Sequence, residues 1–185
     1  MNIQNDNWAV ASRFGLVAER FCSLKDSAAT PDRTKFLVQV YRMLPDLIGE
    51  AIRLLAEEYD DDADDDPETP MYQFRPEARI KHEEWDQLYR ALKEKLGDWN
   101  LYWQVFDPTK DNEAIHGTLA DDLAGIYCDL KDGIRLVEQR QAPAEDIIDG
   151  WRNGFDTHWG RHAINALKTI HVLLEDTFTG LNRSD

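Results

Sequence analysis

The residues of this sequence that are best suited to chemistry are two histidines and two aspartates in its C-terminal third. His158 and His162 are four residues apart, and Asp122 and Asp129 are seven apart. On a helix both spacings place the side chains on one side, where two imidazole rings can share a metal ion. The two carboxylates would complete such a site if the two helices that carry these residues pack antiparallel.

A purely structural role for the same four residues is the competing interpretation. A histidine on an apolar helix face usually hydrogen-bonds inside the core, and a nearby aspartate is its ordinary partner. Aspartate pairs with these histidines, or with Arg152 or Arg161, would hold the last two helices in register without any reaction. We therefore expect a polar network, with a divalent metal site as the alternative. The HxxxH pair also lacks the glutamate that follows the first histidine in zinc proteases, which disfavours that class.

Two segments with helical periodicity carry the four residues. Apolar residues at helical spacing mark the first segment, namely Leu119, Leu123, Ile126, Leu130 and Ile134, and the second, namely Trp151, Phe155, Ala166 and Leu173. Thr118 followed by Asp121 is typical of a helix N-terminus, and Pro143 can open the second helix. Gly154 and Gly160 lie inside that helix and indicate a bend or a close contact.

Residues beside the four candidates also have predicted orientations. Gly125 and Gly133 share a helix edge with the two aspartates, which predicts that another element approaches closely there. A projection at 100° per residue turns Asp121 and Asp132 toward water. The same projection places His171 on the opposite side of the last helix from the two histidines, facing solvent.

The rest of the chain shows further helical patterns. Apolar residues recur every three or four positions over residues 7–24, 36–59 and 80–96. Pro45 removes a backbone donor in the second of these segments, so we expect a kink or two consecutive helices there. Gly97 is a natural end for the third helix.

No segment has a clear strand pattern. The aromatic stretch over residues 99–106 alternates poorly between apolar and polar residues, so we interpret it as a short helix or turn, with a strand as the less favoured alternative. The sequence therefore predicts an all-α fold, a single domain over residues 1–185 built as a bundle of about five to seven helices.

An acidic segment interrupts the helical patterns. Residues 57–68 hold nine acidic residues and no basic one, and residues 60–78 are predicted to form a loop. A calcium-binding EF-hand is excluded because its sixth position, which requires glycine, is Asp65 here. The segment is instead a candidate docking loop for a basic protein partner, through Asp60, Asp61, Asp62, Asp64, Asp65 and Asp66.

Composition restricts the possible partners. The net charge of −15, from 21 basic and 36 acidic residues, opposes binding to nucleic acids and to anionic membranes. No apolar run approaches the roughly 20 residues of a membrane span, and no signal peptide is visible. Cys22 and Cys128 lie far apart among apolar neighbours, as is typical of reduced, buried thiols. We expect a cytoplasmic protein.

Several segments also resemble a bacterial protein family. These are residues 118–131 (TLADDLAGIYCDLK), residues 155–162 (FDTHWGRH) and residues 166–171 (ALKTIH), together with Phe21-Cys22 and the stretch from Tyr102 to Pro108. They are similar to an all-helical family of about this length that is known only as a domain of unknown function. The resemblance covers most of the chain and implies a helical fold; it implies no activity.

Two functions fit these observations. A non-enzymatic protein-binding or regulatory module, working through the acidic segment or an aromatic groove, agrees with the lack of a nucleophile motif and of a glycine-rich phosphate loop. The alternative is a metal-dependent hydrolase, for example one acting on nucleotides, that uses the Asp and His residues of the last two helices. Asp129 and Asp132 match only loosely the acidic pairs that hold magnesium in helical nucleotide pyrophosphatases. We expect no cofactor for the binding module, and the oligomeric state stays open.

Overall fold

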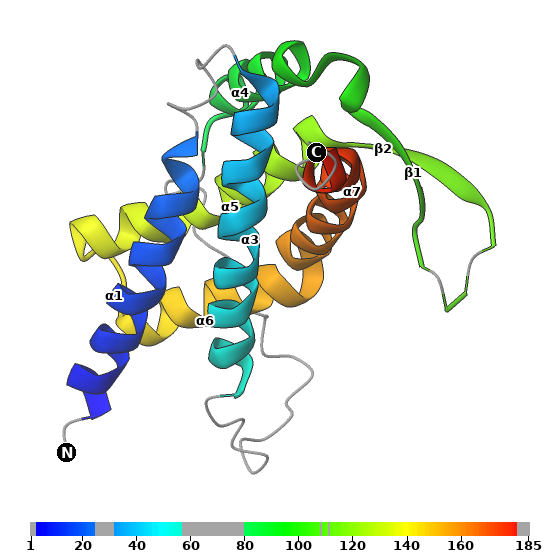
Figure 1. Ribbon diagram of the computed structural model, residues 1–185. Coiled ribbons are helices and arrows are strands. Elements are labelled where there is room, and N and C mark those ends of the chain that lie inside the picture. Colours follow the sequence, from blue (N-terminus) through cyan, green and yellow to red (C-terminus); the bar gives the residue numbers. More distant parts are fainter. Residues whose placement is uncertain (1–2, 25–31, 57–79, 108, 111, 181–185) are drawn as a thin grey trace.

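The computed structural model describes residues 3–24, 32–56, 80–107, 109–110 and 112–180 (Figure 1). Its helices are α1 (Ile3–Cys22), α3 (Arg33–Ala56), α4 (His82–Leu96), α5 (Leu119–Gln139), α6 (Ala144–Gly154) and α7 (Gly160–Gly180). A two-stranded sheet of β1 (Leu101–Val105) and β2 (Ala114–Thr118) is inserted between α4 and α5. The mainly helical architecture confirms the predicted fold class. The predicted acidic loop at 60–78 lies outside the described residues.

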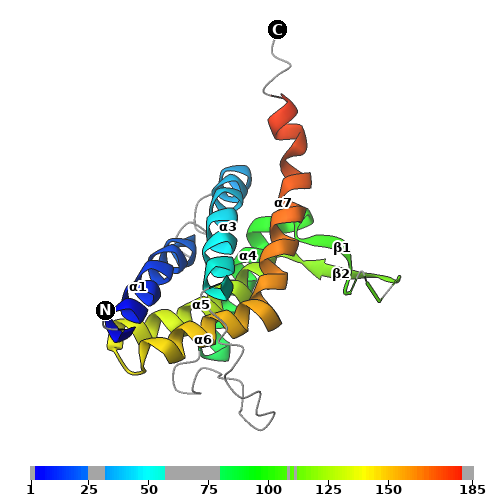
Figure 2. The same cartoon turned by 90° about the horizontal axis from the view of Figure 1, so that it is seen from below.

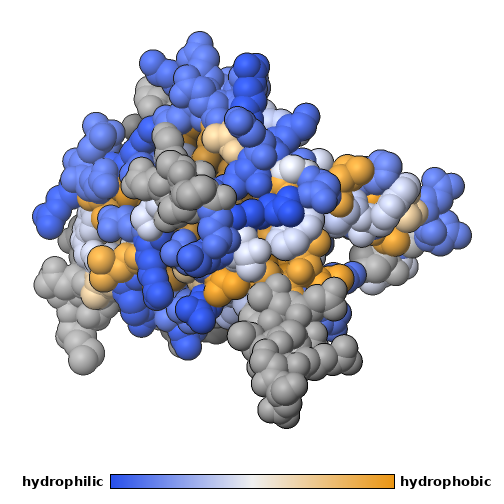
Figure 3. All heavy atoms as spheres, turned by 45° about the horizontal axis from the view of Figure 1, so that its top comes forward, coloured by the Kyte–Doolittle hydropathy of each residue, from blue (hydrophilic) through white to orange (hydrophobic). Residues whose placement is uncertain are grey.

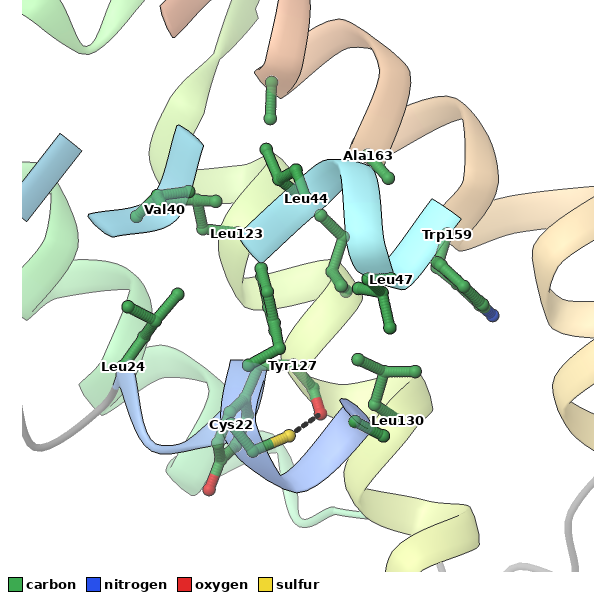
Figure 4. Close-up of a cluster of buried hydrophobic side chains, with 14 of the residues drawn as sticks. Cys22, Leu24, Val40, Leu44, Leu47, Leu123, Tyr127, Leu130, Trp159 and Ala163 are labelled. Atoms are coloured by element: carbon green, nitrogen blue, oxygen red, sulfur yellow. Dashed lines mark hydrogen bonds between the residues drawn. The ribbon is translucent and has the colours of Figure 1, made fainter. Parts of the chain in front are cut away.

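Helix α5 lies at the centre of the bundle and contacts α1, α4, α6 and α7. Helices α1 and α3 lie side by side and cross over α5 and α6 (Figures 1 and 2). The core between these helices contains the fully buried side chains of Trp151, Trp159 and Phe14. Figure 4 shows part of this core, in which the Cys22 thiol lies 3.9 Å from the Tyr127 carbonyl oxygen. Both cysteines are free, as predicted; Cys22 is buried as expected, whereas Cys128 is only partly buried.

Helix α3 continues through Pro45 as a single helix and is not divided there. Of the two outcomes predicted at Pro45, a kink or two consecutive helices, the second is therefore wrong. Leu44 and Leu47 on either side of the proline are fully buried, while Pro45 itself is exposed. Packing of the apolar stripe holds both halves in one helix and outweighs the loss of one backbone hydrogen bond.

Helix α4 ends at Gly97, as predicted, because glycine readily adopts the φ of +54° found there. The Arg33 guanidinium at the start of α3 donates a 2.9 Å hydrogen bond to the carbonyl of Leu96, which the helix itself leaves without a donor. The same side chain lies over the Trp99 ring and forms an ion pair with Asp98. One arginine thus joins the end of α4 to the beginning of α3.

The interpretation of residues 99–106 as a short helix or turn is wrong for most of that stretch. Only the 3-10 turn at Gly97–Trp99 is helical, and β1 follows it. Strands β1 and β2 pair antiparallel, from Leu101 opposite Thr118 to Val105 opposite Ala114. The hairpin projects from the helical body (Figures 1 and 2). Burial alternates along β1, but the exposed positions hold the apolar Leu101 and Trp103, while Tyr102 and the polar Gln104 are half-buried against the helices. The apolar-inside alternation by which a strand is predicted is therefore missing.

The last predicted helix is divided into α6 and α7 by a π-helical turn at Phe155–Trp159. Figure 2 shows that α6 and α7 run in different directions, so the predicted bend exists. A side chain on Gly160 would overlap the Phe155 carbonyl oxygen, which accepts the Gly160 backbone N–H across the π turn. The glycine therefore permits the turn that points α7 toward the hairpin. Within the described residues, no helix is long and apolar enough to cross a membrane.

Candidate functional site

The first polar pair of the site joins α5 to α7. The Asp122 carboxylate is buried, and its Oδ1 lies 2.8 Å from Nδ1 of His162. Its second oxygen accepts a 2.7 Å hydrogen bond from the Tyr102 hydroxyl of β1. The carboxylate therefore ties three elements together, namely the hairpin, α5 and α7.

The second polar pair lies beside the first, nearer to solvent. Oδ2 of Asp129 is 2.7 Å from Nδ1 of His158, which stands in the π turn. The His158 side chain is 56% exposed, compared with 22% for His162. The centroids of the two imidazole rings are 4.9 Å apart and their planes meet at 79°. The four residues thus lie together, as two Asp–His pairs, and the pairing order shows that α5 and the start of α7 run antiparallel.

The protonation of the pairs follows from their surroundings. Burial raises the pKa of Asp122, while hydrogen bonds from His162 and Tyr102 act in the opposite direction. The hydrogen bond to Asp129 raises the pKa of His158. Burial and the neighbouring Asp122 raise the pKa of Tyr102, so its hydroxyl stays a donor. When the two carboxylates are ionised they only accept hydrogen bonds; Nδ1 of each ring then carries the proton, and Nε2 of a neutral ring has a free lone pair.

Both histidines open into a groove of about 550 Å³ between β2 and the start of α7, which we call the histidine groove. The Arg161 guanidinium lies on its wall, 4.2 Å from the centre of the Phe106 ring of the hairpin. On the other side, the His162 ring lies against Gly125, where an added Cβ would be 3.3 Å from the ring. The close approach predicted at Gly125 is therefore confirmed.

A second hollow, of about 260 Å³, lies between β1 and the middle of α7, and we call it the aromatic groove. It is lined by Trp99, Leu101, Tyr102, Trp103, Gln104, Asn165, Lys168, Thr169, Val172 and Leu173. The Asn165 amide donates a 2.6 Å hydrogen bond to the side-chain oxygen of Gln104. Because both residues line both grooves, this bond marks the boundary between them.

The structure corrects one predicted orientation and confirms two others. Asp132 was predicted to face water, but it is buried and accepts a 2.7 Å hydrogen bond from the backbone N–H of Ile80. A helix projection cannot show that a distant segment covers this position. Asp121 and His171 are exposed, as predicted.

The arginine pairing considered from sequence takes a different form. Arg152 forms an ion pair with Asp149 and donates to the carbonyl of Leu54, and so does not pair with the aspartates of the site. Sequence reasoning also missed Tyr102 and Gln104, because it did not recognise their strand. The aromatic content of residues 99–106 was the one signal that pointed to this segment.

The predicted metal site and docking loop have different outcomes. Within the described part of the chain, no three His, Cys, Asp or Glu side chains converge in a way that could hold a metal ion. Metal binding by Asp122, Asp129, His158 and His162 therefore stays a prediction. The six aspartates of the candidate docking loop lie outside the described residues.

The fold and site define a helical domain with a projecting hairpin and a groove that contains two Asp–His pairs. The chain belongs to the family described as Domain of unknown function (DUF5063), whose pattern matches residues 5–176. The crystal structure of protein BF1032 from Bacteroides fragilis is similar, with a TM-score of 0.61 and 23% sequence identity over 87% of this chain and 92% of that one. This likeness supports the fold alone. A comparison with curated proteins gave no match.

Proposed function

We propose that this protein is a non-enzymatic binding module whose aromatic groove holds an extended segment of a partner protein. The observation that supports this function is the concentration of exposed apolar side chains around the hairpin. Of the nine large apolar side chains exposed in the described part of the chain, five line the two grooves beside the hairpin: Leu101, Trp103 and Val172 in the aromatic groove, and Phe106 and Ile115 in the histidine groove. Figure 3 shows apolar atoms on the projecting hairpin. Grouped exposed apolar side chains are typical of interaction sites.

The edge of β1 gives the groove a second means of binding. Four consecutive residues of β1, 101–104, line the groove. Because side chains of a strand alternate between its faces, a hollow that touches four in a row runs along the strand edge. In the described part of the chain β1 pairs with β2 alone, so its other edge has backbone donors and acceptors free for another strand. An extended segment can add to such an edge through main-chain hydrogen bonds.

The side chains that line the aromatic groove indicate the chemical composition of the partner segment that would bind there. Trp99, Trp103 and Val172 offer aromatic and aliphatic surface, and Lys168 is the single charged residue among the lining side chains. An apolar segment in strand conformation, with an acidic side chain opposite Lys168, fits this chemistry. Aromatic residues in such a position commonly supply much of the binding energy.

Selection of peptides from a random displayed library tests this function. Wild-type protein should enrich apolar peptides, and Trp103→Ser or Val172→Ser should weaken their binding at least tenfold, a common effect for interface anchors. Leu16→Ser is the matched control, because Leu16 is as exposed (68%) as Trp103 (67%) but belongs to α1, which lies on the opposite side of the bundle from the hairpin (Figure 1). A selected peptide should also slow hydrogen exchange of β1 amides. Equal binding by wild type and Trp103→Ser, or protection confined to other elements, would contradict the proposal.

The hydrolase alternative has no specific observation in its favour. Magnesium-dependent nucleotide hydrolases of helical type need acidic side chains that face one another across helices. Here Asp132 accepts the Ile80 amide, and Asp129 is paired with His158. The alternative therefore stays a prediction, and the absence of magnesium-stimulated nucleotide hydrolysis by purified protein would remove it.

A further inference from the structure

The two Asp–His pairs leave one nitrogen of each imidazole ring unused. The Nδ1 atoms of His158 and His162 are bound to carboxylates, at 2.7 and 2.8 Å. Among the described residues, no protein group hydrogen-bonds Nε2 of either ring. In proteins, a histidine that binds a metal usually donates its other N–H to a carboxylate or carbonyl, which fixes the tautomer and makes the ligating nitrogen more basic. Both histidines already have this support.

The arrangement of the rings suits a shared ion. The histidines are four residues apart, both line the histidine groove, and their ring centroids are 4.9 Å apart. Imidazole nitrogens bind zinc at roughly 2.0–2.1 Å, so two Nε2 atoms on one ion need only be a few ångströms apart. We propose that Nε2 of His158 and Nε2 of His162 together bind one divalent transition-metal ion of the zinc class in the histidine groove.

The ligand chemistry selects the class of ion. Imidazole suits zinc, copper and nickel, whereas magnesium and calcium prefer carboxylate and carbonyl oxygens. The carboxylates of Asp122 and Asp129 are occupied by the histidines and, in the first case, by Tyr102. Two protein ligands leave coordination positions open toward the groove for water or for a group of a bound molecule. Such a site is weaker than a closed four-ligand zinc site, and it can exchange its other ligands.

Zinc titration of tag-free protein, read by a competing chromophoric chelator, tests the proposal. His158→Ala and His162→Ala should each lower zinc affinity at least tenfold, and the double variant should abolish binding. His171→Ala is the matched control, because His171 is an exposed histidine of the same helix whose Nδ1 is 2.9 Å from the Tyr41 hydroxyl. Asp129→Asn should lower the affinity about 10- to 100-fold, the usual cost of removing a carboxylate behind a ligand.

A second measurement keeps the test independent of folding. In wild-type protein labelled with ¹⁵N at histidine, zinc should shift the Nε2 signals of His158 and His162 and leave those of His171 in place. Unchanged Nε2 signals at saturating zinc, or equal zinc affinity of wild type and the double variant, would overturn the metal site. Trp103→Ser should bind zinc like the wild type, so failure of this site and failure of the peptide-binding function can be told apart.

Discussion

At the scale of single residues, Gly133 is a position of α5 where one added methyl group is expected to be costly. A side chain there would overlap the indole of Trp151, which is fully buried and donates a 3.3 Å hydrogen bond to the carbonyl of Leu130. Because the indole cannot swing away, Gly133→Ala should lower the free energy of unfolding by about 1–3 kcal/mol, the usual cost of overpacking. Urea unfolding of the two proteins measures the difference.

Gly49 provides the control for this prediction. It also lies inside a helix, α3, but apart from its own helix backbone and chain neighbours no atom of the described residues is within 4 Å of the position that a Cβ would take. Gly49→Ala should therefore be neutral or stabilise the protein by up to about 1 kcal/mol, the helix preference of alanine over glycine. If both substitutions changed stability alike, the contact between Gly133 and Trp151 would have no energetic role.

The two thiols should be inert in the folded protein. Burial raises the pKa of Cys22 and of Cys128 to about 12. At pH 8 their thiolate fraction is then roughly a thousandfold below that of an ordinary cysteine, and only the thiolate reacts. Iodoacetamide should thus modify both far more slowly in buffer than in urea, with a rate that rises about tenfold per pH unit up to pH 10. Rapid native modification of Cys128, the more exposed thiol, would contradict this.

At the same scale, the sequence allowed the site residues to be predicted but not all their neighbours. Helical spacing placed Asp122 with Asp129, and His158 with His162, on one side each of two predicted helices, because that relation depends on the helix period. That the two sides face one another follows from the antiparallel packing of α5 and α7, which the sequence analysis had to assume. It could not show that Asp132 is covered by the backbone of Ile80, 52 residues earlier in the chain. Contacts of that kind depend on tertiary packing, which no local pattern contains.

At the scale of elements, the hairpin depends on the helices for its position. A two-stranded sheet is marginal by itself. The hydrogen bonds from Tyr102 to Asp122 and from Asn165 to Gln104 fasten β1 to α5 and α7. Tyr102→Phe and Asn165→Ala should each increase hydrogen exchange of hairpin amides about fivefold, equivalent to about 1 kcal/mol per hydrogen bond.

Tyr41→Phe is the control for the hairpin prediction. The Tyr41 hydroxyl of α3 is also hydrogen-bonded to a side chain of α7, His171, and this bond joins α3 to α7 without involving the hairpin. Its removal should leave exchange of β1 and β2 unchanged. Mass spectrometry of peptic fragments resolves the two regions. Faster exchange across the whole chain in Tyr102→Phe would indicate general destabilisation and would contradict a local fastening role.

The elements that sequence reasoning missed share a physical cause. The prediction relied on apolar side chains marking the buried face, but in β1 the exposed positions carry Leu101 and Trp103 and the half-buried ones carry Tyr102 and Gln104. The π turn at Phe155–Trp159 was visible only as the two glycines that flank it. Helices α1, α4 and α5, whose large apolar residues recur at helical spacing, were predicted to within a few residues of their ends.

At the scale of the whole molecule, the excess of 36 acidic over 21 basic residues favours a basic partner. We propose that the acidic segment, with nine acids in residues 57–68, is where such a partner docks. Replacing Asp60, Asp61, Asp62, Asp64, Asp65 and Asp66 with Asn or Ser should weaken binding of a lysine-rich peptide probe and flatten its dependence on salt, because fewer charges are then screened. Isothermal titration at several NaCl concentrations measures both effects.

Net charge alone would also attract a basic peptide, so the control variant must change the charge equally at other places. Six exposed acidic residues of the described chain serve this purpose, each replaced by its amide: Glu83, Glu94, Glu113, Asp121, Glu138 and Asp156. If the segment is a docking site, this variant should retain most of the affinity that the first variant loses. Equal losses of peptide affinity in both variants would show that the whole acidic surface attracts the peptide regardless of where the charges lie. That result would contradict a docking role for the acidic segment.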